Sequence, residues 1–253
     1  MTSDDRTTIL ITGASSGLGA EMARQFAARG NDLALCARRT DRLESLRKEI
    51  LSAHPDRRIE VRALDVNDHD QVFEVFRAFA SDFGTIDRVV INAGVGKGAP
   101  LGTGRFDANR DTAMTNFVGA LAQSEAAMEV FRAQGSGHFV MISSMSAMRG
   151  MPKELATYAA TKAGVAHLAE GLRMELLGKP IKVTVIYPGY IASEMNEHVK
   201  QKVRFMVSTE KGVRAMVDAI EKEKDSACVP ALPWAPLSVF MRHAPLPVLK
   251  RML

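Results

Sequence analysis

Cysteine is scarce in this sequence. Its 253 residues include only Cys36 and Cys228, and neither belongs to a cysteine–histidine cluster with the spacing of a zinc site. Cys36 lies in an apolar run, as free thiols in protein interiors usually do. We therefore expect two buried free thiols, no metal site, and a cytoplasmic location where thiols stay reduced.

Long apolar runs are missing as well. No segment reaches the ~18 uninterrupted apolar residues of a membrane-spanning helix. The first residues, MTSDDRTTILITG, are polar and acidic, and they lack the basic start and apolar centre of a signal peptide. We therefore expect neither a spanning helix nor a secretory leader.

Concentrated positive charge is a third absence. The formal net charge is +4 and the isoelectric point is near 9.1, but Lys and Arg are scattered, without a basic block or interleaved aromatic residues. Nucleic-acid-binding domains usually gather their basic residues on one face. We therefore expect no nucleic-acid partner. A basic balance also suits an enzyme that holds a phosphorylated cofactor.

What the chain does have is a regular alternation of two patterns. Short runs rich in Val, Ile and Leu, typical of strands buried on both faces, alternate with longer amphipathic stretches typical of helices. This order predicts βαβ units with a parallel sheet, and no linker or repeat divides it. We therefore predict an α/β fold, a single doubly wound Rossmann domain over residues 1–253. The predicted strands are Thr8–Thr12, Asp32–Ala37, Ile59–Leu64, Arg88–Asn92, His138–Ser143 and Lys182–Tyr187, and the predicted helices are Leu18–Arg29, Arg42–Ala53, Gln71–Phe83, Thr112–Ala133 and Leu155–Leu177.

The end of the chain departs from this alternation. No acidic residue follows Asp225, and five of the ten prolines fall within residues 230–253, mixed with large apolar residues and with Arg242, Lys250 and Arg251. We expect a Pro-rich apolar C-terminal extension, about residues 229–253, instead of a further strand–helix unit. Such a segment could cover a substrate pocket, join subunits or contact a membrane surface. Because prolines interrupt a long amphipathic helix, we favour the lid or the subunit contact over the membrane.

A glycine-rich turn joins the first predicted strand to the first predicted helix, with the sequence Thr-Gly-Ala-Ser-Ser-Gly-Leu-Gly over residues 12–19. Glycines accept positive φ and let the backbone approach a ligand, while the helix N-terminus offers free amides to a pyrophosphate. A plain tight turn is the alternative, and the flanking strand and helix disfavour it. The residues predicted to contact a dinucleotide are Gly13, Ser15, Ser16, Gly17, Leu18 and Gly19.

Two arginines, Arg38 and Arg39, follow the second predicted strand. An NAD-binding unit usually has an acidic residue here for the ribose 2′-hydroxyl. A guanidinium matches a 2′-phosphate both in charge and in fork geometry. We therefore predict that NADP(H) is preferred over NAD(H). The alternative is that both arginines are solvated loop residues.

Tyr158 and Lys162 are four residues apart in the last predicted helix, so both side chains lie on one helix face. A nearby ammonium favours the phenolate, which makes the tyrosine a better proton donor and acceptor near neutral pH. By itself this pattern is also that of an ordinary surface pair. Ser144, at the end of the fifth predicted strand, and Asn116 before it favour the catalytic interpretation.

With these motifs in this order, the sequence resembles the short-chain dehydrogenase/reductase superfamily from about Thr8 to Ser193. The resemblance implies that the serine positions the substrate oxygen, the tyrosine exchanges the proton, the lysine binds the nicotinamide ribose and tunes the tyrosine, and the asparagine supports a water-linked proton path. The interval from the serine to the tyrosine is one residue longer than is usual in the family, which leaves Ser143 and Ser146 as alternatives. The implied catalytic residues are Asn116, Ser144, Tyr158 and Lys162.

The resemblance also implies further cofactor contacts and an assembly. The family places an acidic–hydrophobic pair at the adenine ring, an Asn-Ala-Gly after the fourth strand, and a Pro-Gly segment with a hydroxyl residue at the nicotinamide. Family members are commonly homo-oligomers, so we expect a dimer or tetramer, with Ala163–Leu176 as a candidate interface. Besides Tyr158 and Lys162, the corresponding cofactor residues are Asp65, Val66, Asn92, Ala93, Gly94, Pro188, Gly189, Ile191 and Ser193.

The implied activity is that of an NADP(H)-dependent oxidoreductase that interconverts a carbonyl and an alcohol. Methionines after Ser144 and after the Pro-Gly segment indicate a pliable apolar wall, which favours an apolar ketone or a 3-oxoacyl-type substrate. The alternative is a non-catalytic NADP(H)-binding regulatory protein, which usually lacks part of the tetrad. The candidate pocket residues are Met145, Met148, Met151, Met195, Val199, Phe205 and Met206.

Overall fold

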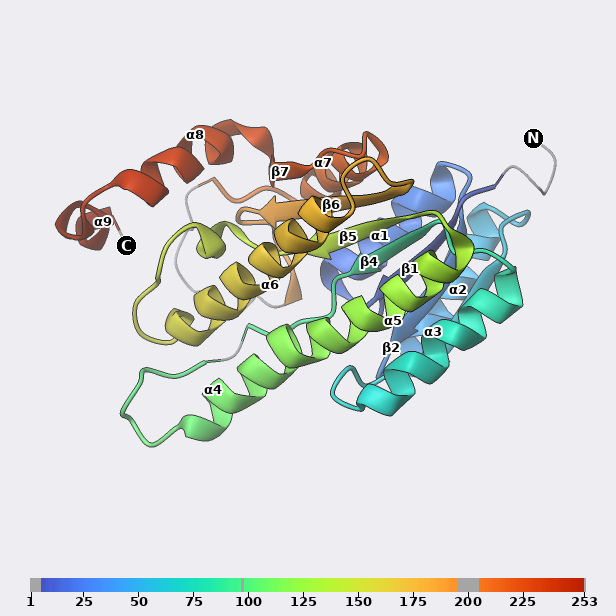
Figure 1. The fold of residues 1–253 in the computed structure, drawn as a ribbon, viewed down its shortest axis with the longest axis horizontal. Coiled ribbons are helices and arrows are strands. Elements are labelled where there is room, and N and C mark those ends of the chain that lie inside the picture. Colours follow the sequence, from blue (N-terminus) through green and yellow to red (C-terminus); the bar gives the residue numbers. More distant parts are fainter. Residues whose placement is uncertain (1–5, 97, 195–204, 253) are drawn as a thin grey trace.

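The computed structural model describes residues 6–96, 98–194 and 205–252, and a sheet lies between two layers of helices (Figure 1). In this part of the chain every paired strand is parallel, and the seven strands follow the order β3-β2-β1-β4-β5-β6-β7. The predicted doubly wound α/β fold is confirmed. The strands are β1 (Thr8–Thr12), β2 (Asp32–Ala37), β3 (Ile59–Ala63), β4 (Arg88–Ile91), β5 (Gly137–Ile142), β6 (Ile181–Pro188) and β7 (Ser226–Val229).

The strands are apolar on both faces because helices cover both. In β1, Ile9 and Ile11 pack on one side of the sheet, and Leu10 between them packs on the other; all three are at most 1% exposed. Alternation of side chains along a strand therefore builds two separate cores. One core contains α1 (Gly17–Ala28), α2 (Thr40–Ala53) and α7 (Thr209–Glu221), and the other contains α3 (His69–Phe83), α5 (Gly119–Gln134) and α6 (Leu155–Glu175) (Figure 1).

The long helix predicted over Thr112–Ala133 is interrupted. It begins earlier, as α4 (Phe106–Ala113), passes through a π-helical turn, η2 (Met114–Val118), and continues as α5. No proline interrupts residues 112–133, and the sequence did not reveal this turn. Such turns occur often at functional sites, and Asn116 lies in this one.

The sequence did not predict α7 or β7. The expectation that no strand–helix unit follows is wrong, because β7 pairs with β6 and leads into α8 (Ala231–His243). Strand β7 has only four residues, and the first of them is exposed, which gives little apolar signal. Cys228 of β7 is half-buried, so of the two free cysteines only Cys36 is buried as expected.

The C-terminal residues form two short helices, α8 and α9 (Leu246–Met252), which are separated by Ala244 and Pro245. Leu232 is non-helical, so Pro233 occupies the first regular helical position and Pro236 follows within one turn. Amides in a first turn have no partner in the helix, and a missing N–H costs little there. Among the described residues, no helix is both long enough and apolar enough to cross a membrane.

A buried polar chain crosses three neighbouring strands. Arg88 Nε of β4 donates to His138 Nδ1 of β5 at 2.9 Å, and His138 Nε2 lies 2.8 Å from Thr184 Oγ1 of β6. Because Nδ1 accepts a hydrogen bond from arginine and so carries no hydrogen, the neutral ring has its hydrogen on Nε2. Burial, together with the charge of Arg88, lowers the pKa of His138 to about 3.

We expect this histidine to make the fold sensitive to acid. Its pKa is lower in the folded chain than in the unfolded one, so its stabilising effect is complete above about pH 6.5 and is lost towards about pH 3. The free energy of unfolding should fall by roughly 1.4 kcal/mol per pH unit in this range. Urea unfolding at pH 7 and pH 5 should show a smaller pH difference for His138→Gln than for wild type. Exposed His167→Gln should keep the wild-type difference, and equal slopes for all three proteins would contradict the assignment.

Candidate active site

The predicted site residues gather at one edge of the sheet. Parallel strands end at the same edge, and the short turn η3 (Met145–Met148), the helix α4 and the helix α8 lie there as well (Figure 1). The loops after β1, β2, β4, β5 and β6 therefore meet. Ligands of open α/β sheets bind at this edge.

The glycine-rich loop lies directly on the end of β4. Gly13 and Gly17 have φ of +65° and +54°, where a side chain would be strained. A Cβ at Gly13 would lie 2.8 Å from Ala93 Cα, and one at Gly19 would lie 2.7 Å from Asn92 Nδ2. The glycines are therefore needed for the close approach of loop and strand, and the cradle they form suits a dinucleotide.

Thr12 holds this contact together, although the sequence did not single it out. Its Oγ1 accepts the backbone N–H of Asn92 at 3.0 Å and that of Ala93 at 3.1 Å. Asn92 Nδ2 in turn donates to Thr12 O at 2.9 Å. The only sequence signal was a hydroxyl at the end of a buried apolar strand. Thr12 and Asn92 thus fix the loop relative to the sheet.

The N-terminus of α1 offers unpaired amides. Ser16 is its N-cap residue but makes no side-chain capping hydrogen bond. Its Oγ instead accepts from Arg39 Nη2 at 2.5 Å, and Arg39 Nε lies 3.3 Å from Ser15 Oγ. A helix start without a cap, beside a guanidinium, fits the pyrophosphate of a dinucleotide.

The two predicted phosphate-binding arginines differ. Arg39 reaches the glycine-rich loop, whereas Arg38 is exposed and has no hydrogen bond or ion pair among the described residues. Glu194, which the sequence did not single out, lies 3.4 Å from Arg39 Nη1 and 2.7 Å from Arg42 Nη1. Burial raises the pKa of Glu194, but its contacts with the two arginines outweigh this and hold the pKa below its usual value. No local motif could reveal this pairing, since 155 residues separate Arg39 from Glu194.

Ser144 follows β5 and is the N-cap residue of η3. Its Oγ accepts the backbone N–H of Ser146 at 3.1 Å and the Ser146 hydroxyl at 2.9 Å. With both lone pairs engaged, its own hydrogen is free to donate, and a hydrogen bond joins it to Tyr158. Ser143 Oγ instead donates to Lys162 O at 2.8 Å and is buried. The geometry favours Ser144 over both alternatives, with Ser146 as its support.

Tyr158 and Lys162 lie on the same face of α6, and Lys162 Nζ is 5.9 Å from the centre of the tyrosine ring. Lys162 Nζ also donates to Ile142 O at 2.9 Å, and burial lowers the pKa of the ammonium to about 8. We expected lysine to lower the pKa of Tyr158. The pKa is raised, because burial of the phenol outweighs the hydrogen bond with Ser144.

Asn116 fastens the loop after β4. Its Oδ1 accepts from Val95 N–H at 2.7 Å, and its Nδ2 donates to Val95 O at 2.8 Å. A Cβ at Gly94 would lie 3.2 Å from Asn116 Oδ1 and 3.6 Å from Lys162 Nζ. Asn116 and Lys162 thus meet at the Asn-Ala-Gly motif, and Tyr158 lies beside Lys162. The role of Asn116 in a water-linked proton path stays a prediction.

The Pro-Gly segment after β6 packs under the C-terminal helices. Gly189 N–H donates to Val229 O at 2.9 Å, and a Cβ at Gly189 would overlap the indole of Trp234 in α8. Trp234 meets Tyr190 edge-on, with ring centres 5.6 Å apart. Met145, Met148 and Trp234 share one apolar cluster. The sequence did not connect the C-terminal segment with this motif.

The remaining predicted residues take different places. Ser193 faces the glycine-rich loop, since a Cβ at Gly17 would lie 3.6 Å from Ser193 Cβ. Ile191 is buried against Gly212 of α7. Asp65 Oδ1 accepts from Asn67 N–H at 3.0 Å, and the neighbouring Val66 is buried. Met195 and Val199 lie outside the described residues, while Phe205 and Met206 are exposed.

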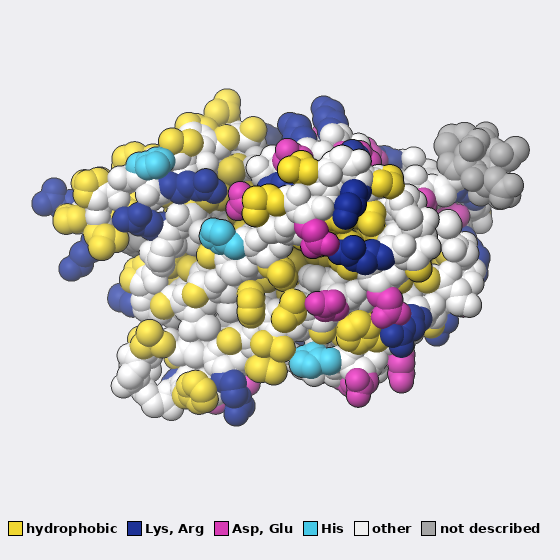
Figure 2. Space-filling model, in the orientation of Figure 1, with side chains coloured by type: hydrophobic (Ala, Val, Ile, Leu, Met, Phe, Trp, Pro, Cys, Tyr) yellow, Lys and Arg dark blue, Asp and Glu magenta, His cyan; other side chains and the backbone are white. Residues whose placement is uncertain are grey.

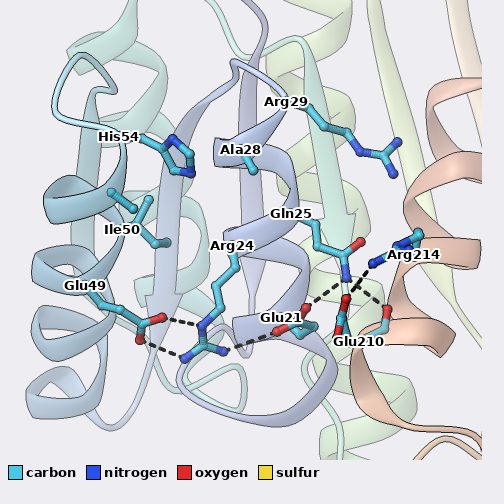
Figure 3. Close-up of a pocket in the computed structure, with 11 residues that line it drawn as sticks. Glu21, Arg24, Gln25, Ala28, Arg29, Glu49, Ile50, His54, Glu210 and Arg214 are labelled. Atoms are coloured by element: carbon cyan, nitrogen blue, oxygen red, sulfur yellow. Dashed lines mark hydrogen bonds and ion pairs between the residues drawn. The ribbon is translucent and has the colours of Figure 1, made fainter.

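Two surface grooves lie near α1. One, with a volume of about 530 Å³, is lined by Gly17, Ser193 and Glu194 and therefore adjoins the glycine-rich loop. The other, of about 450 Å³, lies between α1, α2 and α7, and its charges pair with each other, as Arg24 with Glu49 at 2.7 Å (Figure 3). Because its arginines are already ion-paired, it carries no catalytic assignment.

Comparison with known proteins agrees with the geometry. A family model described as short chain dehydrogenase matches residues 7–204. The chain belongs to the short-chain dehydrogenase family. An uncharacterized oxidoreductase of Mycobacterium tuberculosis is 54% identical over 237 residues, which cover 94% of this chain and 93% of the relative. The chain is thus an oxidoreductase of the class that acts on alcohol and carbonyl groups.

Two solved structures share the fold at low identity. An alcohol dehydrogenase from the archaeon Thermococcus sibiricus, complexed with 5-hydroxy-NADP, is 23% identical with a TM-score of 0.80, over 90% of this chain and 97% of that one. A short chain dehydrogenase/reductase from Burkholderia phymatum, in complex with NAD, is 20% identical with a TM-score of 0.82, over 98% and 97%. The family binds nicotinamide cofactors, and both forms occur among the neighbours.

We expect Gly189 and Trp234 to act as a coupled pair in stability. Gly189→Ala should destabilise the fold by about 1–3 kcal/mol through overpacking, and Trp234→Ala by about 3–5 kcal/mol through a cavity. The double variant should be less destabilised than the sum, because the added methyl then has room. Urea unfolding measures all three, and Gly171→Ala, where a Cβ meets nothing within 4 Å, is the control. Additive effects would show that the indole does not pack on this glycine.

Proposed function

We propose that the protein is an NADP(H)-dependent oxidoreductase that interconverts an apolar ketone, or a 3-oxoacyl-type substrate, with the corresponding alcohol. The observation that carries this proposal is the junction of β5 and α6. There the Ser144 hydroxyl, supported by Ser146, lies beside Tyr158, and Lys162 lies on the same helix face. This arrangement provides a hydrogen-bond donor and a proton donor for one carbonyl oxygen.

The proton chemistry follows from the site's burial. When bound, the nicotinamide ring supplies the hydride in reduction or accepts it in oxidation. The raised pKa keeps Tyr158 protonated at neutral pH, which suits it as the acid of a reduction. Ser144 positions the oxygen that receives this proton. Lys162 is charged below its pKa of about 8, and its ammonium supports the phenolate that forms.

The preference for NADP(H) rests on Arg39 and Arg38. Arg39 follows β2, and its guanidinium contacts Ser15 and Ser16 of the glycine-rich loop, where the adenosine half of a dinucleotide would bind. No acidic residue follows β2 before Asp41. A guanidinium here suits a 2′-phosphate and leaves a ribose 2′-hydroxyl without its usual acidic partner. Glu194 forms an ion pair with Arg39, so its carboxylate would compete with the 2′-phosphate for this guanidinium.

The apolar substrate class is supported by the cluster beyond Ser144. Met145 and Met148 are buried against Trp234 of α8, and Met151 packs on them. Methionine surfaces adapt to varied apolar ligands. A homo-oligomer is supported by exposed apolar residues along α4 to α6, among them Met114, Phe117 and Leu121.

The decisive measurement is NADPH consumption with a panel of ketones, 3-oxoacyl thioesters and steroids. Tyr158→Phe should lower kcat/KM by about 10²–10⁴-fold, because the proton donor is lost, while NADPH affinity stays close to wild type. Tyr187→Phe, another half-buried tyrosine, should keep its activity and is the matched control. Turnover that survives in Tyr158→Phe would mean that another group donates the proton. Tight NADPH binding without turnover of any panel member would favour the non-catalytic, cofactor-binding alternative.

Cofactor preference has its own test. Arg39→Ala should weaken NADPH binding by roughly 10- to 100-fold and leave NADH binding almost unchanged, since only the 2′-phosphate is lost as a partner. Glu194→Gln should tighten NADPH binding several-fold, because it removes a competing carboxylate. Fluorescence titration measures both, with Arg38→Ala and the distant Arg47→Ala for comparison. Equal affinity of wild type for NADH and NADPH, or unchanged NADPH affinity after replacement of Arg38 and Arg39 together, would contradict the proposal.

A further inference from the structure

The helix α8 is apolar on two opposite faces. Its inner face packs on the catalytic end of the sheet through Trp234 and Met241, which are 4% and 9% exposed. Its outer face presents Val239 and Phe240, which are 60% and 41% exposed, and Leu232, which precedes the regular turns, is 77% exposed. A surface helix normally has a polar face toward the solvent. A helix with apolar residues on opposite faces is usually packed against other groups on both of them. The outer face of α8 therefore lacks a cover.

The exposed apolar surface continues onto α9. Leu246 and Val248 of this helix are exposed, whereas Leu249 is buried against the inner cluster. The two helices extend beyond the end of the sheet that carries the site, away from the rest of the molecule (Figure 1). We call the exposed residues Leu232, Val239, Phe240, Leu246 and Val248 the α8–α9 face.

The charges around this face are of one sign. Arg242, Lys250 and Arg251 are exposed, and none of them is ion-paired with a described carboxylate. Arg242 lies next to the inner cluster, because its Nε donates to Met148 Sδ at 3.2 Å, whereas Lys250 and Arg251 belong to α9. No acidic residue occurs after Asp225. In Figure 2 the end of the molecule formed by α8 and α9 shows apolar and basic side chains without acidic ones. A partner for this face should therefore be apolar and negatively charged.

We propose that the α8–α9 face docks on a lipid bilayer with anionic headgroups. Apolar residues of an interfacial helix enter the boundary between headgroups and acyl chains, while Lys and Arg contact the anionic lipids. Both components are present here, and α8 and α9 are helical although they contain Pro236 and Pro247. Docking needs no spanning helix and holds the catalytic edge of the sheet close to the membrane.

A second copy of the chain fits this face less well. In a twofold interface the same patch contacts itself. Such a contact would bring the cations of two copies together, and residues 226–253 supply no Asp or Glu to pair with them. The structure therefore favours the anionic bilayer over a subunit contact.

The test is co-sedimentation of the full chain with vesicles. Wild type should bind mixed phosphatidylcholine–phosphatidylglycerol vesicles and bind pure phosphatidylcholine vesicles far more weakly. Replacing Arg242, Lys250 and Arg251 together by Gln should lower the partition coefficient roughly 100-fold, since each cation near an anionic surface contributes about fivefold. Exchanging exposed Lys48, Lys222 and Lys224 for Gln is the control with the same change in net charge.

A second pair of variants tests the apolar component. Val239→Ser with Phe240→Ser should also release the protein from vesicles, whereas Met174→Ser with Leu177→Ser, at 66% and 74% exposed positions elsewhere, should not. All of these side chains are at least partly exposed, so thermal unfolding should show that the variants stay folded. Truncation is a weaker test because it would uncover Met145 and Met148.

Three outcomes would overturn the proposal. The first is equal binding to neutral and anionic vesicles, and the second is wild-type binding by the charge variant. The third is a wild-type dimer in light scattering that Val239→Ser with Phe240→Ser converts to a monomer, which would make the face a subunit interface. Because these measurements involve no catalysis, they are independent of the proposed reaction.

Discussion

The candidate site depends on two reciprocal hydrogen bonds between β5 and α6. Ser143 Oγ donates to Lys162 O at 2.8 Å, and Lys162 Nζ donates to Ile142 O at 2.9 Å. Both lie in a buried region, where hydrogen bonds are strong and costly to break. They fix one turn of the helix against the end of the strand. Tyr158, one turn earlier, is thereby held beside Ser144, whose own position depends on Ser146.

The sheet, most of its helices and the motifs that carry the chemistry could be predicted because their signals are local. A buried parallel strand is an apolar run, and Tyr158 and Lys162 share a face because they are one helical turn apart. The seventh strand had no such signal, because Ser226 to Val229 is short and partly exposed. The π-turn at Asn116 was missed for a different reason, since no proline marks it in the sequence.

Contacts between distant segments could not be predicted. Glu194 meets Arg39, and Trp234 lies on Gly189, only because separate loops end at the same edge of the sheet. The pKa of Tyr158 was misjudged for a related reason. The motif names the charged neighbour, Lys162, but desolvation depends on everything packed around the phenol, and here it has the larger effect.

The contact between Trp234 and Gly189 gives the C-terminal helices a second consequence. Gly189 begins the segment that leads to Ser193 beside the glycine-rich loop and to Glu194 on Arg39. One face of α8 is thus joined to the cofactor region, while its other face is open. A partner on the open face that shifts the Trp234 indole would change the affinity of the protein for its cofactor. Linkage then requires that the cofactor change the affinity of the protein for that partner by the same factor. A partner that leaves Trp234 in place would bind independently, because it would interact equally with both states of the site.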